Sequence, residues 1–301
     1  MNAKIAGITY KKPQVYLLQE TGIGTCELAA RTCYNSFDKS ENKSIIALNN
    51  QVTKAIKNNL DFPSLSGVTQ SDISHINTIE HSDLLDDLAW TYFHHSILEH
   101  ANLTYLIKST SRGVLQEHSR HRIQGISVQS TRYTMSSVIN AFIASVFNTP
   151  EAFNSTEWFI AKMFELDLLV TTDTEYNRIE YRSIFAKLLH QMNTIGREEF
   201  KKLAVVKSSL KYVDTLDRLE LYEALQKGKQ KRNVGDAFKH IVTDNWKVDM
   251  VVTMNLRALK NYLELRNSGA AYFQIQWLAE AMMNATPDKY LKLISKKHKD
   301  N

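Results

Sequence analysis

The densest group of chemically active side chains lies in one short segment, residues 120–132, with the sequence RHRIQGISVQSTR. Three guanidinium groups, one imidazole and two serine hydroxyls gather there. Arginine binds phosphate with two parallel hydrogen bonds and keeps its charge at any physiological pH. In an extended segment, Ser130 and Arg132 would point to the same side, because they are two residues apart. Together they could hold the phosphate and the base edge of one nucleotide.

A basic surface loop of no specific function, or a phosphate-contact patch for nucleic acid, is the simpler reading of an isolated Arg-His-Arg. The longer string is more specific, because Arg-His-Arg is followed after seven residues by Ser130 and then by Arg132. If each residue type has a frequency of about 5%, five fixed positions match by chance about once in 10⁴ chains of this length. This string resembles the signature of the flavin-dependent thymidylate synthase family.

Three other segments are similar to the same family. His94 and His100, with Glu99 between them, precede the strand-like NLTYLIK and resemble the family's histidine block. AARTCY, residues 29–34, resembles its N-terminal helix, and MNLRALKNYLELR, residues 254–266, resembles its Asn-x-Arg helix. Asn255 and Arg266 are eleven residues apart, about three helical turns, so they share a face. The resemblance covers residues 3–35, 90–135 and 235–285.

The resemblance implies the reductive methylation of dUMP to dTMP. Methylenetetrahydrofolate would give the carbon, FAD would mediate its transfer and supply hydride, and NADPH would reduce the flavin. It also implies a homotetramer whose active sites are built from several subunits, and a reaction without a cysteine nucleophile. Small-molecule substrates are therefore expected, with no nucleic acid and no membrane as partner.

The resemblance also assigns roles to individual residues. The expected dUMP contacts are Gln116, Glu117, Arg120, Ser130, Thr131, Arg132, Lys239, His240 and Arg266. The expected FAD contacts are Cys33, His94, Arg120, His121, Arg122, Ile123, Val128, Asn255 and Asn261. Ser130 and Arg266 are the expected catalytic residues. Ser130 would lie near the pyrimidine, and the cation of Arg266 at the uracil carbonyl would stabilise charge that develops when the ring is activated.

The chain departs from the family pattern at three places, all among or beside the expected nucleotide contacts. Glu117 stands where the family often has Gln, and Gln116 beside it could take that role. Ser127-Val128 replaces an Asn-Glu pair. Residues 238–242, with Lys239 and His240, replace an Arg ahead of Leu-Pro. These departures motivate one alternative, a relative that binds flavin and nucleotide but does different chemistry.

A second alternative is a non-catalytic nucleic-acid-binding protein that uses Arg120, Arg122, Arg132 and the basic turn at residues 227–233. No basic patch interleaved with aromatic residues supports this reading. The histidines at 94, 95 and 100 have no carboxylate spacing typical of metal ligands, so we expect no metal site.

The composition describes the scaffold that must position these residues. Glycine and proline together make up 14 of 301 residues, whereas average usage would be about 12%. This scarcity favours long helices. We therefore predict an α+β fold, helix-rich, with a mainly antiparallel central sheet flanked by helices. It would be a single domain, residues 1–301, with an extra helical lobe inserted at about 150–230.

Periodicity places the elements. We expect strands within residues 5–17, 102–108 and 248–253, and helices at 25–34, 44–58, 71–95, 111–118, from 255 onward and at 271–283. Residues 119–133 are expected to form a polar loop. Cys26 and Cys33 predict no disulfide scaffold and a reducing cytoplasm. Both are expected to pack in the interior, with Cys33 close to the flavin. The net charge of +5 suits an anionic small molecule as well as a nucleic acid.

Overall fold

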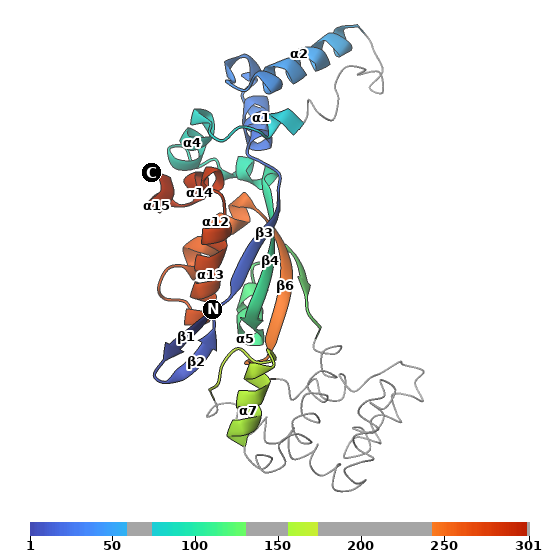
Figure 1. The fold of residues 1–301 in the computed structure, drawn as a ribbon. Helices are drawn as coiled ribbons and strands as arrows, with labels where there is room; N and C mark the ends of the chain where they lie inside the picture. The colour runs from blue at the N-terminus through green and yellow to red at the C-terminus, as the bar shows by residue number, and fades with distance from the viewer. Residues whose placement is uncertain (59–73, 131–155, 174–242, 300–301) are drawn as a thin grey trace, which may run out of the picture. The chain divides into compact units, whose positions relative to one another are not determined.

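The computed structural model of the chain describes residues 1–58, 74–130, 156–173 and 243–299 (Figure 1). The chain forms two compact units. The first unit comprises residues 1–14, 108–119 and 128–250, and the second comprises residues 15–107, 120–127 and 251–301. Four of the five boundaries fall inside strands, and the fifth, between residues 119 and 120, follows a helix. Among the described residues, no helix is both long and apolar enough to cross a membrane.

A four-stranded sheet contains the strands at which these boundaries fall. Its strands, in spatial order, are β3 (Gln14–Glu20), β4 (Asn102–Ser111), β6 (Lys247–Asn255) and β5 (Gly125–Val128). The amide of Leu256, just after β6, donates to the carbonyl of Ala101, just before β4, at 2.8 Å. Because the end of one strand meets the start of the other, the two run antiparallel. The hydroxyls of Thr104 and Thr253 lie across this pair at 2.9 Å.

One face of the sheet forms the core. Along β4, the side chains of Leu103, Tyr105 and Ile107 are fully buried, and those of the residues between them are half-buried. Val252 and Met254 of β6 are buried with the same alternation. This period of two is expected when one sheet face is covered by helices and the other is open.

Helices of the second unit pack on one another. They are α1 (Gly24–Cys33), η1 (Phe37–Lys39), α2 (Lys43–Lys57), α4 (Asp83–Trp90), η3 (His95–His100), α12 (Leu256–Arg266), α13 (Phe273–Ala285), α14 (Asp288–Ile294) and α15 (Lys296–Lys299). α12 packs against η3, α13 and α14, and α1 packs against η3 and α4. α12 and α13 are neighbours in Figure 1.

The start of α1 requires a glycine. A Cβ at Gly24 would lie 1.7 Å from the carbonyl oxygen of Ile76, which is closer than any real contact. The backbone of the 74–77 segment therefore lies directly against the first turn of α1. Nearby, the buried hydroxyl of Tyr290 accepts the amide hydrogen of Gly22 at 2.8 Å, which ties α14 to the same region.

The first unit contains a hairpin, β1 (Asn2–Ile5) and β2 (Ile8–Lys11), with an antiparallel register. Its two-residue turn, Ala6 and Gly7, has positive φ at both positions, as the twist of such a hairpin requires. The unit also contains α5 (Arg112–His118) and α7 (Thr156–Glu165). Burial alone would raise the pKa of Asp167, but hydrogen bonds from Lys11 and Lys247 outweigh it and lower that pKa.

Most of the predicted elements are confirmed, and so is the α+β class. The helices at 25–34 and 44–58, the strands at 102–108 and 248–253, and the helix that starts after Asn255 agree with α1, α2, β4, β6 and α12 to within a few residues. Within 150–230, α7 is a described helix; the rest of the predicted lobe beyond residue 173, with the basic turn at 227–233, lies outside the described residues. The extent of that lobe stays a prediction.

Two expectations about local structure are wrong. The continuous helix from 71 to 95 is interrupted, because the described chain leaves helical geometry before Ser82, whose φ of −157° is extended. α4 then covers residues 83–90 and ends before Phe93, whose φ is +56°. The polar loop at 119–133 also contains an unexpected strand, β5, at the edge of the sheet. Ile126 and its neighbours on β5 are exposed, so no apolar alternation indicated the strand.

Candidate active site

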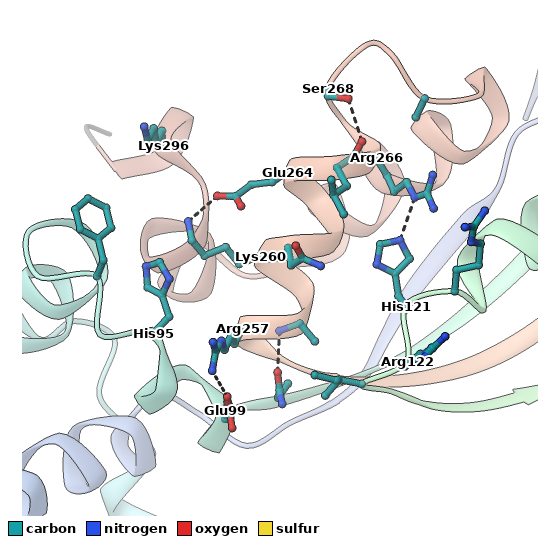
Figure 2. Close-up of a pocket in the computed structure, with 18 of the residues that line it drawn as sticks. His95, Glu99, His121, Arg122, Arg257, Lys260, Glu264, Arg266, Ser268 and Lys296 are labelled. Atoms are coloured by element: carbon teal, nitrogen blue, oxygen red, sulfur yellow. Dashed lines mark hydrogen bonds and ion pairs between the residues drawn. The ribbon is translucent and has the colours of Figure 1, made fainter.

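A pocket of about 1200 Å³ lies within the second unit. Its walls come from the end of α4 and the turn after it, from η3, from residues 120–123, and from α12 with its N-cap Asn255 (Figure 2). Ser268, Ala270, Ala271 and Lys296 complete them. The volume exceeds the roughly 300–1,000 Å³ that is typical of ligand sites, so the pocket is large enough for more than one small molecule.

α12 forms the central wall of the pocket, and its first turn is set by Asn255. The side-chain oxygen of Asn255 accepts the amide hydrogen of Ala258 at 2.8 Å, which satisfies one of the helix's unpaired N–H groups. Since the cap uses the oxygen, the side-chain amide nitrogen is the group that Asn255 can offer to a ligand. Asn261 lies further along the same helix and also lines the pocket.

His121 and Arg266 are in direct contact at one end of the pocket (Figure 2). Nε of Arg266 donates to Nε2 of His121 at 3.0 Å. The imidazole also lies with its edge against the buried ring of Tyr262, with 4.7 Å between ring centroids. Burial lowers the pKa of His121, and the neighbouring positive charge of Arg266 lowers it further. An imidazole that accepts a hydrogen bond from arginine is neutral and carries its proton on Nδ1.

Arg120 and Arg122 flank this histidine and are both exposed. Within the described part of the chain neither makes an ion pair. Arg257, by contrast, is paired with Glu99. Two guanidinium groups without carboxylate partners at the rim of a pocket are a suitable arrangement for binding phosphate groups.

The structure brings seven of the predicted site residues to this one pocket. They are Arg120, His121, Arg122, Ile123, Asn255, Asn261 and Arg266. They come from two segments more than 130 residues apart in sequence. Their meeting at one pocket therefore depends on the fold. The predicted shared face of Asn255 and Arg266 agrees with their lining the same pocket.

Other predicted residues do not line it. Cys33 and His94 are exposed, and Nδ1 of His94 is 2.8 Å from the hydroxyl of Tyr34. Gln116, Glu117, Val128 and Ser130 belong to the first unit. The side-chain amide of Gln116 donates to Asp244 at 2.7 Å. Thr131, Arg132, Lys239 and His240 lie outside the described residues.

The expectation that both cysteines are buried is half wrong. Cys26 is fully buried, and burial raises the pKa of its thiol to about 12. Cys33 is exposed. It is the last residue of α1, and burial along that helix ends one turn earlier, at Ala30.

Sequence reasoning missed several residues that line the pocket. These are Trp90, Phe93, His95, Arg257, Lys260, Glu264 and Lys296, among others. The helical spacing of Arg257, Lys260 and Glu264 along the predicted helix is a signal that could have indicated a shared polar face. Trp90 and Lys296 come from distant segments, and no spacing rule would have joined them.

Comparison with known families settles the class of this chain. The sequence model of a family described as "Thymidylate synthase complementing protein" (Thy1) matches residues 16–289, which is most of the chain. The chain belongs to this family. The resemblance inferred from residues 120–132 and the supporting segments is thereby confirmed at the level of the family.

Relatives with this family's activity in their names match two thirds of the chain or more. A flavin-dependent thymidylate synthase from Wolinella succinogenes is 27% identical over 276 residues, which is 92% of this chain and 94% of the relative. One from Campylobacter jejuni is 25% identical, covering 92% and 93%. One from Helicobacter pylori is 28% identical over 208 residues, covering 68% of this chain and 76% of the relative.

A solved structure shows the same fold. The crystal structure of Thymidylate Synthase X (ThyX) from Helicobacter pylori with FAD and dUMP has a TM-score of 0.53 against this chain and is 23% identical. The match covers 95% of this chain and 99% of the other.

Proposed function

We propose that this protein is a flavin-dependent thymidylate synthase that converts dUMP to dTMP. Methylenetetrahydrofolate is the carbon donor, FAD is the cofactor and NADPH is the reductant. The observation that carries this proposal is the pocket in which Arg120, His121, Arg122 and Arg266 meet the two asparagines of α12, in a chain of the Thy1 family. Relatives named for this activity support it.

The donor set of the pocket fits a flavin nucleotide. Arg120 and Arg122 would hold its phosphates, and the side-chain amides of Asn255 and Asn261 would hydrogen-bond its polar edges. Cys33, His94, His121, Ile123 and Val128 complete the proposed FAD contacts. When bound, FAD supplies the hydride that reduces the transferred carbon to a methyl group.

Arg266 is the proposed electrophilic group. Its Nε donates to His121, and the guanidinium also carries two terminal amino groups, which are donors of the kind that hydrogen-bond a uracil carbonyl. A fixed cation there stabilises negative charge that develops on the pyrimidine ring as carbon 5 becomes nucleophilic. His121 keeps the guanidinium in place. Because its imidazole is neutral, it offers no positive charge that would compete with Arg266 for the anionic substrate.

The remaining proposed dUMP contacts are Gln116, Glu117, Arg120, Ser130, Thr131, Arg132, Lys239 and His240. Ser130 is proposed to act at the pyrimidine and Arg132 at the phosphate. The enzyme is proposed to be a homotetramer with active sites shared between subunits. A reducing cytoplasm is the proposed location, on the basis of a chain with two cysteines.

The test is turnover by the reconstituted protein. The protein is loaded with FAD and reduced anaerobically with NADPH. Tritium release from dUMP labelled at carbon 5 is then followed with methylenetetrahydrofolate present. We expect release together with dTMP. A folded, flavin-loaded protein that releases no tritium would instead be a relative with different chemistry, and failure to take up flavin would refute the proposal altogether.

A further inference from the structure

The pocket has two chemically different ends. His121, Arg122 and Arg266 lie on one side of α12, and His95, Lys260 and Lys296 lie on the other (Figure 2). We call the second group, together with Trp90 and Phe93, the lysine end. The first group forms the guanidinium end of the pocket. The lysine end offers ammonium groups beside aromatic rings instead.

Lys260 is a nearly buried cation at the centre of the lysine end. It is 7% exposed, and its Nζ lies 4.6 Å from the centroid of the Trp90 ring. The indole is itself fixed, because its Nε1 donates to the carbonyl of Lys292 at 2.8 Å. Lys260 is paired with Glu264 at 2.8 Å, so one positive charge here is already balanced.

Lys296 adds a second ammonium group without adding a carboxylate. It is the first residue of α15, and its side chain lines the pocket. Among the described residues it makes no ion pair. The lysine end as a whole therefore carries an excess of positive charge that a bound anion would neutralise.

Phe93 presents an aromatic ring at the same end in a strained backbone. Its φ is +56°, a region that costs a bulky L-residue about 1–2 kcal/mol. The turn is held by the amide of His94, which donates to the carbonyl of Leu88 at 2.8 Å. The residue is 61% exposed, and its ring lies edge-on to the imidazole of His95, with 6.0 Å between the ring centroids. A strained position that exposes an aromatic ring beside a pocket provides a stacking surface for a planar ligand.

We propose that the lysine end binds the tail of the folate substrate, which is an aryl ring followed by glutamate carboxylates. The aryl ring stacks on the exposed ring of Phe93, and a carboxylate pairs with Lys296. This inference rests on the proposed function. Of the ligands which that reaction needs, FAD, dUMP and NADPH carry phosphates and suit the guanidinium end. Folate carries carboxylates on an aromatic group and no phosphate.

A direct consequence is a preference for folates with longer glutamate tails, because a longer tail brings more negative charge to the unpaired ammonium of Lys296. The experiment measures KM for methylenetetrahydrofolate with one and with five glutamates in wild type and in Lys296→Gln. We expect the variant to lose part of the preference, with KM for the five-glutamate form rising about two- to fivefold. The value of kcat and the FAD content should not change.

Lys297→Gln is the matched control, because Lys297 is exposed on the same helix and does not line the pocket. It removes the same charge and should leave both KM values unchanged. The increase in KM for Lys296→Gln should also shrink at high salt, because an exposed ion pair is screened.

Three results would overturn the inference. The wild-type enzyme could have the same KM for folates with one and with five glutamates. Lys296→Gln could also have the same KM values as Lys297→Gln. Alternatively, Lys296→Gln could lose FAD or raise KM for NADPH, which would assign the lysine end to a phosphate ligand. If wild type makes no dTMP at all, the proposed function itself is wrong. This failure is distinguishable from a failure of the folate-tail inference, because it is seen in wild type before any variant is compared.

Discussion

At the scale of single residues, the contact between His121 and Arg266 explains why a histidine stands between two arginines. Burial disfavours a positive charge on the imidazole, and the guanidinium of Arg266 would repel that charge. The neutral ring instead accepts from Arg266 and fixes it at the pocket wall. The histidine is therefore a positioning residue in this account, and Arg266 is the group that would touch the substrate.

The first prediction concerns this pair. In Arg266→Gln the pKa of His121 should rise, because the repulsion from the guanidinium is removed while burial remains. Its titration can be followed by the chemical shift of the ring proton. The same variant should bind dUMP more weakly, with KM for dUMP rising by about tenfold or more. An unchanged His121 titration would contradict the assignment.

The lowered pKa also sets the direction of a pH effect on stability. Below the ordinary value of 6.5 the unfolded chain binds a proton at His121 more readily than the folded chain. The stabilisation is therefore complete above pH 6.5 and is lost as the pH falls through the folded pKa. Urea unfolding between pH 8 and pH 5 should show that the free energy of unfolding falls less with decreasing pH in Arg266→Gln than in wild type.

The second prediction concerns Ser130. Ser130→Ala should lower kcat by about a hundredfold, because it removes a polar group proposed to act at the pyrimidine. Flavin content, read from the absorbance of the purified protein, should stay at the wild-type level. Ser127→Ala, an exposed serine three residues earlier, is the control and should be nearly as active as wild type. Equal kcat values for the two variants would remove Ser130 from the site.

At the scale of secondary-structure elements, α12 organises the pocket. Its apolar side, with Leu259 and Leu263, is buried against the core. Its polar side supplies Arg257, Lys260 and Asn261 to the cavity. One helix thus joins the guanidinium end and the lysine end, and its start is determined by a single capping residue.

The third prediction separates the two roles of that cap, Asn255. Asn255→Ala should lower the free energy of unfolding by about 1 kcal/mol, through the lost bond to the amide of Ala258. Asn255→Asp keeps an accepting oxygen and should be as stable as wild type. Both variants should bind FAD more weakly, since both lose the amide donor and aspartate adds a negative charge near phosphate. Equal FAD affinity of Asn255→Asp and wild type, in fluorescence titrations, would show that the cap is purely structural.

The fourth prediction concerns the start of α1. Gly24→Ala should destabilise the protein by at least about 2 kcal/mol, because the new methyl group would overlap the carbonyl oxygen of Ile76 and backbone yields little. Gly125→Ala is the matched control, because its new methyl group would lie 3.8 Å from its nearest neighbour, Thr253. Urea unfolding of both variants decides the matter, and similar midpoints would contradict the packing described for α1.

The sequence was informative where local pattern determines structure. The alternation in residues 102–108 and the helical spacing after Asn255 are local properties, and both elements are confirmed as β4 and α12. The break before Ser82 and the positive φ of Phe93 were not predictable, because tertiary packing overrides an otherwise helical pattern. For the same reason, no spacing rule indicated that Lys296 lines the pocket.

At the scale of the whole molecule, family membership and the pocket together support one enzyme. The match to the family covers residues 16–289, and the relatives are similar over nearly their full length. The departures of this chain from the family pattern at Glu117 and Ser127-Val128 are therefore local.

The fifth prediction is the assembly state. Sedimentation of the FAD-loaded protein should give a homotetramer, and dilution below the assembly range should reduce activity in parallel with dissociation, because the active sites are proposed to be shared. A monomer with full activity would contradict the proposal.

A single-turnover experiment is the sharpest test of the proposed thymidylate synthase activity. The FAD-loaded protein is reduced, freed of NADPH, and mixed anaerobically with dUMP and methylenetetrahydrofolate. We expect one dTMP for each flavin reoxidised, with neither product nor reoxidation when dUMP is omitted. Flavin that stays reduced in the presence of both substrates, in a protein that binds dUMP, would contradict it.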